Sequence, residues 1–393
     1  MFNEIELSSV ITDIAAGPFG SNLKVSCFVP YGFPIIDGAN LKGFKVTDNL
    51  TKFVTEEKAR SLSRSIARRG DVIITISGTL GQIAYIPDDS MFEEYLCSQR
   101  QFRVSFDSSR VYVPYLVFYF HTNEGQGKIL SFANQTGVPA LSQPLKNFRK
   151  IRIQLPSYTE QRRIASVIEA INDKIECNQK VNDNLQQQAQ ALYKHYFPYS
   201  VGDELPDGWR IGSVGEIIEI HDSKRIPLSG AERAKMEKKT YPYYGAAALM
   251  DYVDDYIFDG KYLLLGEDGT VVDEAGYPIL QYVWGQFWVN NHAHILTGKL
   301  GFNVESLYML FKQTPVKAIV TGAVQPKISQ TNLRSIQVVI PPQKLLTDYN
   351  SQIEPLFALL RTNEETNKSL TALRDTLLPK LMSGELDVSN IQL

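Results

Sequence analysis

A long internal repeat constrains this chain more than any other feature of its sequence. The dipeptides Leu155-Pro156 and Ile340-Pro341 each end a run of alternating apolar residues, and they lie 185 residues apart. Alternating runs that end in proline predict β-strands. The same offset continues without a gap through Ile168-Glu169 with Ile353-Glu354, Asn178 with Asn363, Asn182 with Asn367, Leu185 with Leu370 and Leu192 with Leu377. Such a chain is expected to contain two copies of one structural unit.

Both copies carry a heptad pattern. In the first copy it advances by four and three residues through Ile164, Ile168, Ile171, Ile175, Asn178, Asn182, Leu185, Ala189, Leu192 and Tyr196. In the second copy it runs through Ile353, Leu356, Leu360, Asn363, Asn367, Leu370, Arg374, Leu377 and Leu381. Heptads of this kind predict two helices that pair as a coiled coil.

The limits of the first helix are marked in the sequence. Ser157 and Glu160 fit a capping box, and Pro198 follows the last position of the heptad pattern. The helix is predicted to run roughly from Thr159 to Phe197 and to be about 55 to 60 Å long. In the second copy, Pro355 is expected to kink the helix or delay its first turn.

Asparagines interrupt both apolar seams at matched places, Asn178 and Asn182 in one copy and Asn363 and Asn367 in the other. One such helix alone would be interpreted as an ordinary amphipathic core helix. Matched polar interruptions in two copies favour a coiled coil whose register the asparagines fix. If a rotation relates the copies, the helices run antiparallel. Asn178 then lies near Asn367 and Asn182 near Asn363, and the C-terminus returns to the first globular segment.

The segments 1–155 and 200–340 repeat each other distantly. The matches are Phe33-Pro34-Ile35-Ile36 with Tyr241-Pro242-Tyr243-Tyr244, Gly70 to Thr79 with Gly260 to Thr270, and Ala140 to Gln143 with Lys327 to Gln330. Buried strands that lead into glycine turns are typical of compact domains. We therefore expect an α+β, pseudo-twofold protein with two homologous globular domains, 1–155 and 200–340, joined by helical segments 156–199 and 341–393.

Charge and cysteine usage restrict the possible functions. The net charge of −3 argues against a nucleic-acid binder that acts alone, because such proteins usually carry a basic excess. One stretch is locally basic, with Lys52, Lys58, Arg60, Arg64, Arg68 and Arg69 against Glu56 and Glu57. That stretch alone would be interpreted as a solvated helix face. A partner that supplies most phosphate contacts would remove the need for a basic reader.

The three cysteines, Cys27, Cys97 and Cys177, have no metal-binding or disulfide spacing. The start of the sequence has no apolar signal core, and the most apolar run, Val111 to Phe120, is about half a membrane span. We expect a cytoplasmic protein.

The order of globule, long helix, globule and long helix resembles the specificity subunits of Type I restriction-modification systems (the HsdS family) across the whole chain. The motifs that carry the resemblance are Gly17 to Lys24, Gly70 to Ile74, Leu155 to Ile164 with its Glu160-Gln161-Arg162-Arg163 run, and Leu377 to Leu386. The resemblance implies that each globule is a target-recognition domain for double-stranded DNA. It also implies that the helices are the central and C-terminal shared regions.

The resemblance further implies two methyltransferase subunits as partners, with a motor-nuclease subunit left open. S-adenosylmethionine is expected in the methyltransferase, and no cofactor in this chain. Two related surfaces should bind two copies of one partner. The expected partner-binding residues are Glu160, Gln161, Arg162, Arg163 and Asp348. The second copy has Leu345-Leu346-Thr347-Asp348 in place of the charged run, so the two partner contacts are expected to differ in detail.

Catalytic motifs are absent from the sequence, which predicts a subunit that is not an enzyme. It has neither a glycine-rich phosphate loop followed by Lys-Ser/Thr nor the Asn/Asp-Pro-Pro-aromatic motif of adenine methyltransferases. A metal-dependent nuclease built from Asp207, Glu237 and Lys239 is disfavoured, because Glu237 lies in a charged amphiphilic run. His292 and His294 have no carboxylate or cysteine at ligand spacing, so we expect core or DNA-facing histidines and no metal.

Candidate DNA-reading residues are polar side chains near the glycine turns, since such side chains read base edges. In the first domain they are Lys24, Asn40, Lys42, Ser77, Thr79, Gln82, Gln99, Arg100 and Gln101. In the second they are Lys224, Arg225, Glu267, Asp268, Thr270, Asn290, Asn291, His292, Gln325 and Lys327. For each residue, a role in a turn or on the solvated surface is at least as probable as base contact.

Two other classes of protein stay open. A carbohydrate or peptide binder could line its grooves with Tyr241, Tyr243, Tyr244, Tyr282, Trp284 and Trp288. A dimeric transcription regulator would normally carry one recognition domain and a basic helix per chain.

The two globules have diverged while the helices have kept their spacing. We therefore expect two unrelated half-sites at a fixed distance that the coiled coil sets. Four residues inserted near Asn184 would add about 6 Å of helix and lengthen the spacer by roughly one to two base pairs.

Overall fold

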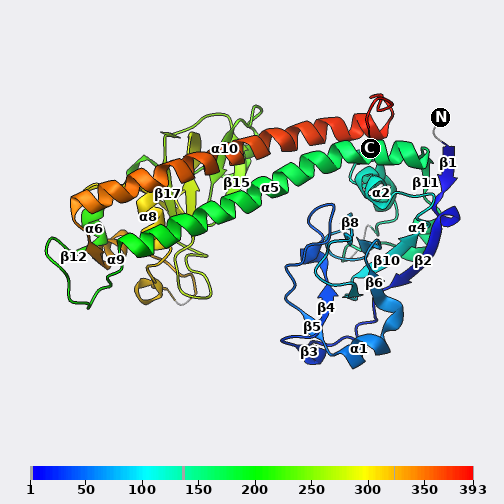
Figure 1. Cartoon of the computed structure of the whole chain (residues 1–393), viewed down its shortest axis with the longest axis horizontal. Coiled ribbons are helices and arrows are strands. Elements are labelled where there is room, and N and C mark those ends of the chain that lie inside the picture. Colours follow the sequence, from blue (N-terminus) through cyan, green and yellow to red (C-terminus); the bar gives the residue numbers. More distant parts are fainter. Residues whose placement is uncertain (1–2, 135–137, 323, 393) are drawn as a thin grey trace. The chain divides into compact units, whose positions relative to one another are not determined.

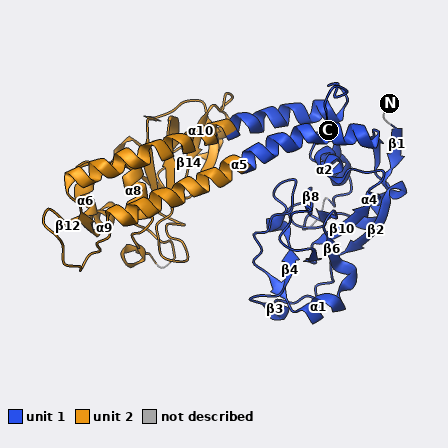
Figure 2. Cartoon of the chain, viewed as in Figure 1, with its two compact units in different colours: residues 1–176, 367–393 blue, residues 177–366 orange. Residues whose placement is uncertain are grey.

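The computed structural model describes residues 3–134, 138–322 and 324–392. The chain divides into two compact units, one formed by Met1–Glu176 with Asn367–Leu393 and the other by Cys177–Thr366 (Figure 2). The two longest helices, α5 (Tyr158–Tyr196) and α10 (Gln343–Met382), each contribute one part to each unit (Figure 1). Among the described residues, no helix combines the length and the apolar character needed to cross a membrane.

In its described residues, the first unit contains three sheets and four short α-helices. Its strands are β1 (Asn3–Glu6), β2 (Ile11–Ala16), β3 (Phe28–Val29), β4 (Phe33–Ile36), β5 (Phe53–Val54), β6 (Ile66–Arg68), β7 (Val72–Thr75), β8 (Ile83–Tyr85), β9 (Glu94–Cys97), β10 (Gln101–Phe106) and β11 (Arg152–Leu155). Its helices are α1 (Glu56–Ser61), α2 (Val113–Phe120), α3 (Asn123–Leu130) and α4 (Pro144–Arg149), besides its parts of α5 and α10.

The second unit contains a similar set of elements. Its strands are β12 (Arg210–Ser213), β13 (Ile218–Ile220), β14 (Tyr241–Tyr244), β15 (Leu249–Val253), β16 (Phe258–Asp259), β17 (Tyr262–Gly266), β18 (Leu280–Val283), β19 (Gln286–Val289), β20 (Ala293–Gly298) and β21 (Gln337–Ile340). Its helices are α6 (Val214–Ile217), α7 (Gly230–Ala234), α8 (Val304–Phe311) and α9 (Gln330–Ser335).

Strand pairing confirms that the two globules are copies of one fold. Each unit has a four-stranded antiparallel sheet, in the order β2-β10-β7-β8 in one and β13-β20-β17-β18 in the other. Each also joins its first and last strands, so Leu155 pairs with Asn3 and Ile340 pairs with Arg210. A parallel pair, β4 with β9 or β14 with β19, completes the correspondence.

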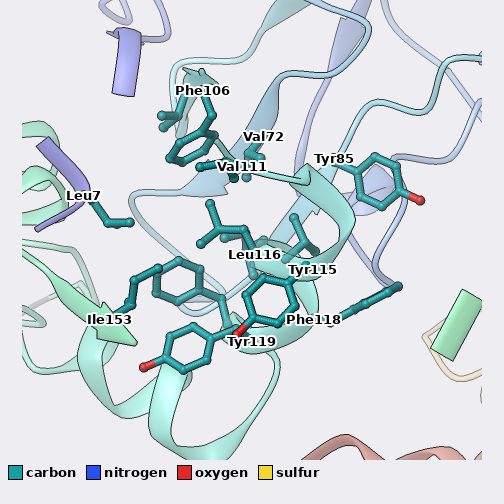
Figure 3. Packing of buried hydrophobic residues seen from close by; sticks show 14 of the residues in the cluster. Leu7, Val72, Tyr85, Phe106, Val111, Tyr115, Leu116, Phe118, Tyr119 and Ile153 are labelled. Carbon is teal, nitrogen blue, oxygen red and sulfur yellow. The ribbon is translucent and has the colours of Figure 1, made fainter. Parts of the chain in front are cut away.

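The core of each unit includes residues of both long helices. In the first unit, Tyr115 and Leu116 of α2 pack among side chains of the strands (Figure 3). Ile164 and Ile168 of α5 and Leu381 of α10 belong to the same core. In the second unit the corresponding residues are Leu185, Ala189 and Tyr193 of α5 and Tyr349, Ile353 and Phe357 of α10. The helix pair therefore forms one wall of each globule.

The helices run antiparallel in each unit, as expected. In the first unit, Arg374 donates to Asn172 Oδ1 at 3.2 Å. In the second unit, the Tyr349 hydroxyl donates to the Ala189 carbonyl at 3.3 Å. Residue numbers in α10 fall as those in α5 rise. The C-terminal segment packs on the core of the first unit through Val388, which agrees with the expected return of the chain.

The helix limits agree with the capping signals but not with the delay expected from Pro355. Helix α5 begins at Tyr158, and the Glu160 N–H donates to the Ser157 hydroxyl at 3.3 Å. Helix α10 begins at Gln343 and continues through Pro355, so the expected delay of its first turn is wrong. Pro355 and Ser351, whose carbonyl loses its intrahelical partner, are both exposed, so water can satisfy that carbonyl.

Candidate nucleic-acid interface

Two matching turns carry part of the predicted DNA-reading residues. The turn Ser98 to Gln101 follows β9, and its first N–H donates to the Ile36 carbonyl at 2.9 Å. The turn Asn290 to Ala293 follows β19, and its first N–H donates to the Tyr244 carbonyl at 3.0 Å. Ile36 and Tyr244 end the equivalent strands β4 and β14. The same backbone position thus presents Ser-Gln-Arg-Gln in one globule and Asn-Asn-His-Ala in the other.

The glycine turns after β7 and β17 also match. Gly78 donates to the Pro139 carbonyl and Gly269 to the Pro326 carbonyl, both at 3.0 Å. Both glycines have positive φ, 94° and 84°, a conformation that favours glycine. Isolated bridges join Ser77 to Ala140 and Asp268 to Lys327. The distant sequence repeat that paired these segments is therefore confirmed.

In the first globule, most of the predicted residues surround one hollow of about 770 Å³. Its lining includes six of the nine candidates: Ser77, Thr79, Gln82, Gln99, Arg100 and Gln101. Apolar side chains form another part of the lining, among them Leu23, Val25, Phe28 and Ile35. A cavity of this size with a few convergent polar groups is typical of a ligand-binding site.

Most of the amide and carboxylate groups that line the hollow form hydrogen bonds or ion pairs with neighbouring protein groups. Gln82 accepts from the Thr75 hydroxyl at 2.9 Å and donates to the Gly38 carbonyl at 2.9 Å. Gln101 is 2% exposed, and its Oε1 accepts a hydrogen bond from the Ser98 hydroxyl. Asp37 forms an ion pair with Lys52 at 2.5 Å. Burial acts to raise the Asp37 pKa, but the hydrogen bond and charge of Lys52 hold it below its usual value of 3.8.

The three other candidates of the first globule do not line the hollow. Lys24 and Lys42 are exposed, and Lys24 lies between the lining residues Leu23 and Val25. Asn40 is 4% exposed, donates to the Thr47 and Asn49 carbonyls at 3.2 Å and accepts from the Asp37 N–H at 3.0 Å. Its amide holds a loop together and is not free to read a base, which corrects that expectation.

The loop that follows β2 approaches the Ser98 to Gln101 turn at Gly17. The Gly17 N–H donates to the Gln101 carbonyl at 2.8 Å. A Cβ at Gly17 would lie 1.9 Å from the Ser98 carbonyl oxygen, closer than any real contact. Glycine is therefore required for the two segments to meet, which gives the Gly17 to Lys24 motif a physical role.

In the second globule, the predicted residues contact one another directly. Arg225 forms an ion pair with Glu267 at 2.6 Å and donates to the carbonyls of Asn291, at 3.4 Å, and Ala293, at 2.8 Å. Lys327 lies 3.3 Å from Glu267. His292 forms a hydrogen bond with Asp268. Arg225, Glu267, Asp268, Asn291, His292 and Lys327 are thus brought together from four segments.

The remaining candidates of this globule lie beside that cluster. Lys224, Thr270 and Gln325 are exposed. Asn290 is 4% exposed, accepts from the His292 N–H at 2.8 Å and donates to Met250 Sδ at 3.3 Å. Asn290 therefore shapes the turn, which corrects its expected role as a base reader.

Asp222 is the buried centre of this cluster, and sequence reasoning missed it. Its carboxylate accepts from His294 at 2.6 Å, from the Ile295 N–H at 3.0 Å and from Gln330 at 2.6 Å. Burial acts to raise the Asp222 pKa, but the hydrogen bond and charge of His294, the Ile295 N–H and Arg225 keep it below its usual value of 3.8. An Asp in a 3₁₀ turn, Asp222–Lys224, has no sequence signature that would have singled it out.

Asp222, Glu267 and His294 are close enough together to be tested as a metal site. His294 is fully buried, as a core histidine, and its Nε2 lies 2.8 Å from the Ile328 carbonyl. Its Nδ1 lies 2.6 Å from Asp222 Oδ2, so both ring nitrogens are already engaged by protein groups. Arg225 contacts both carboxylates and supplies the balancing charge. The residues therefore fit a salt-bridge cluster and not a metal ion.

At the start of α5, the structure separates the expected partner-binding residues. Gln161 is fully buried, accepts from the Tyr112 N–H at 2.8 Å and donates to the Arg110 and Pro156 carbonyls. It fastens the globule to the helix, which corrects its expected role at a partner surface. Arg162 and Asp348 are exposed, and Glu160 and Arg163 are half-buried. Leu346, the match of Gln161, is buried in the second core.

Sequence reasoning also missed the polar contacts that connect each globule to a long helix. Glu305 is fully buried and contacts Lys261 at 2.7 Å, Arg361 of α10 at 3.2 Å and the Tyr282 hydroxyl at 2.7 Å. In the first unit, the Tyr112 hydroxyl donates to Glu169 of α5 at 3.0 Å. The only sequence signal was the match of Glu169 with Glu354, which binds the same Lys261 and Arg361.

The seam asparagines are mostly buried. Asn363 donates to Asn182 Oδ1 at 2.8 Å, the contact expected for that pair. Asn182 also donates to Glu364 at 3.1 Å. Asn367 is buried and donates to the Ile175 carbonyl at 3.5 Å, and Asn178 is 3% exposed. That these amides fix the register stays a prediction.

The aromatic residues considered for a carbohydrate-binding or peptide-binding groove make their contacts in different parts of the second unit. Tyr243 is 1% exposed, Trp284 donates to Glu365 of α10 at 3.1 Å, and Trp288 donates to the Ile226 carbonyl at 2.6 Å. Four hollows, lined by described residues within 13–173 and 193–339, do not include these aromatic residues in their lining. The structure gives no support to a carbohydrate-binding or peptide-binding groove made from them.

Comparison with known proteins identifies the relatives of the chain. The family model of the Type I restriction modification DNA specificity domain matches residues 29–187 and 206–371. The chain is 24% identical over 368 residues to the Type I restriction enzyme MjaIX specificity subunit of Methanocaldococcus jannaschii, with 86% of this chain and 82% of that protein covered. It is 32% identical over 144 residues to the putative type I restriction enzyme specificity subunit S.HindORF215P of Haemophilus influenzae, with 37% of this chain and 36% of that protein covered.

The fold is similar to that of a solved structure, the Type-I restriction-modification system S subunit from M. genitalium. The TM-score is 0.56 at 16% identity, and the alignment covers 97% of this chain and 96% of that one. The family model matches two segments, one in each globule together with part of the helix that follows it.

Proposed function

The chain belongs to the family of Type I restriction-modification DNA specificity subunits, and we propose that it reads a two-part DNA site with one half-site for each globule. The family members are non-catalytic, DNA-recognising subunits of restriction systems. The finer assignment, that the two globules read unrelated sequences at a fixed distance, is our inference.

One observation carries this proposal. The equivalent turns after β9 and β19 have the same backbone anchors but different side chains, Arg100 and Gln101 against His292 and Ala293. Direct readout depends on the donors and acceptors that a side chain presents to a base edge. Two globules with one scaffold and different reading groups are suited to two different half-sites.

We further propose that the chain positions two methyltransferase subunits, which hold the S-adenosylmethionine. The chain has a net charge of −3, so the partner would supply many of the phosphate contacts. The exposed Arg162, with Glu160 and Arg163 beside it, and the exposed Asp348 in the second copy are the proposed contact residues.

The test of this function is a gel-shift assay on a random duplex library with the chain alone and with a co-expressed methyltransferase. We expect sequence-selective retention with the partner present and enrichment of a bipartite motif. Enrichment of a single continuous motif would contradict the two-part site. Exchange of residues 200–340 for the domain of another family member should then change one half-site only.

Reversing the charge of Arg162 and Arg163 tests the partner contact. Because Leu345 to Asp348 replace the charged run in the second copy, the double variant Arg162→Glu/Arg163→Glu should lose one partner more readily than the other. Native mass measurement should show complexes with a single methyltransferase. The matched control is Lys194→Glu, on an exposed position of α5. An unchanged two-to-one stoichiometry in the double variant would show that these arginines do not hold the partner.

A further inference from the structure

We propose that the hollow of the first globule reads a guanine, with Gln101 and Arg100 as hydrogen-bond donors to its O6 and N7. This inference rests on the proposed function and names the base that the first domain selects. The reading groups lie at the start of β10 and in the turn before it.

The orientation of Gln101 decides what it can recognise. Its Oε1 is already occupied by the Ser98 hydroxyl. Its Nε2 contacts no hydrogen-bond acceptor in the described part of the chain, although the residue is only 2% exposed and lines the hollow. An amide held in this way keeps its NH2 group available as a donor.

Other polar groups of the hollow support the same conclusion. The amide of Gln82 is bonded at both ends, so it holds the Gly38 segment in place and does not face a ligand as a free group. The Asp37 carboxylate is neutralised by Lys52 and accepts from the Ala39 N–H at 2.8 Å. The Arg100 guanidinium is exposed at the rim and forms no ion pair among the described residues. Arg100 is therefore a free cationic donor next to Gln101 in the sequence.

Among the bases, guanine best matches the two donors of Arg100 and Gln101. Its major-groove edge carries two acceptors, O6 and N7, which the arginine fork fits. Adenine carries one acceptor and one donor, and cytosine offers a donor, so both would meet a donor of the protein with a donor of their own.

The second globule lacks these groups at the equivalent turn. His292, at the position of Arg100, is bonded to Asp268, and Ala293 stands at the position of Gln101. The inference therefore applies to the half-site of the first globule alone.

The first test uses the unaltered chain in complex with its methyltransferase. Methylated-site mapping first gives the bipartite motif, and domain exchange then shows which half-site belongs to the first globule. Each guanine of that half-site is replaced in turn. We expect 7-deazaguanine, which lacks N7, to weaken binding roughly 5- to 150-fold at one position, the range of one bidentate contact. Inosine, which keeps O6 and N7, should bind there like guanine.

The second test changes the protein. Gln101→Glu replaces the free donor with an acceptor, so the motif should change from guanine toward cytosine at that position. Gln101→Leu should relax the choice of base without a new preference. Gln154→Glu, on an exposed position of β11 in the same unit, adds the same charge away from the hollow and should keep the motif.

Two results would overturn the inference while leaving the proposed function intact: a first half-site without guanine, or full binding to 7-deazaguanine at every guanine. A retained guanine in Gln101→Glu would likewise exclude Gln101 as the reader. A complex without any bipartite motif would instead contradict the proposed function.

Discussion

At the scale of single residues, the interface depends on which polar groups are already bonded inside the protein. Arg100 and Asn40 both lie near turns, and the sequence predicted both as DNA readers. The side-chain amide of Asn40 donates to the Thr47 and Asn49 carbonyls. The Arg100 guanidinium, in contrast, is exposed and forms no ion pair among the described residues. Local sequence could suggest the set but could not separate these cases, because the competing acceptors come from other segments.

Gly17 provides a prediction at this scale. In Gly17→Ala the new Cβ would lie 1.9 Å from the Ser98 carbonyl oxygen, so the turn that carries Arg100 and Gln101 must move. We expect methylated-site mapping to show weaker selection at the first half-site, with the second half-site unchanged, and a loss of roughly 1–3 kcal/mol in unfolding free energy.

The matched control is Gly43→Ala, because a Cβ there would meet nothing within 4 Å. Normal selection of the first half-site by Gly17→Ala would show that the close approach of the two segments does not position the reading groups.

The lowered pKa of Asp222 gives a prediction about pH. Because the pKa is lower in the folded state, the stabilisation is fully present above its usual value of 3.8 and is lost as the pH falls through the lowered value. Asp222→Asn should lower the unfolding free energy of the second unit at neutral pH by about 3–5 kcal/mol, because it breaks a buried ionic network with His294 and Arg225.

Urea unfolding between neutral pH and about pH 3 measures this effect. The unaltered chain should lose stability below about pH 4 more steeply than Asp222→Asn does. Asp255→Asn, at an exposed residue of the same unit, serves as the control. Parallel pH profiles for the unaltered chain and Asp222→Asn would contradict the role of the carboxylate.

At the scale of elements, the two long helices were predicted well because heptad spacing and capping are local signals. The delay expected from Pro355 was wrong, since a proline that faces solvent is tolerated inside the helix and the sequence does not state its exposure. The role of Gln161 was also hidden, because it depends on the Tyr112 N–H and the Arg110 carbonyl of a distant loop. Periodicity shows that a helix face is buried, but it does not show which groups cover it.

The contact between Asn182 and Asn363 can be tested at this scale. Asn182→Ala removes the acceptor at 2.8 Å and leaves the Asn363 amide without that partner, which should lower the unfolding free energy by about 1–3 kcal/mol. The double variant Asn182→Leu/Asn363→Leu should recover much of that loss, because an apolar pair leaves no unsatisfied amide.

If the amides fix register, the double variant should accept more than one spacer length in methylated-site mapping. Asn184→Leu, at an exposed neighbouring position of α5, is the control. If the stable double variant still selects one unchanged spacer length, the asparagine pair stabilises the helices but does not set the spacer.

At the scale of the whole molecule, the repeat predicted two globules and two helices because copies of one unit must fold alike. The structure assigns one part of each helix to each unit, with the change at residues 176–177 in α5 and 366–367 in α10. In our account, the globules therefore select the bases of the two half-sites, and the helices set the distance between the half-sites. The identity of the bases was beyond the sequence, because it depends on turns whose side chains are oriented by distant contacts.

The most direct test of the central claim is to lengthen both helices where they pass from one unit to the other. Inserting seven residues after Glu176 and seven after Thr366 keeps the heptad seam and adds about 10 Å of helix. Because base pairs stack at about 3.4 Å, methylated-site mapping should show both half-sites unchanged and a spacer longer by about three base pairs. An unaltered spacer in a folded, methylating complex, or altered half-site bases, would contradict the account.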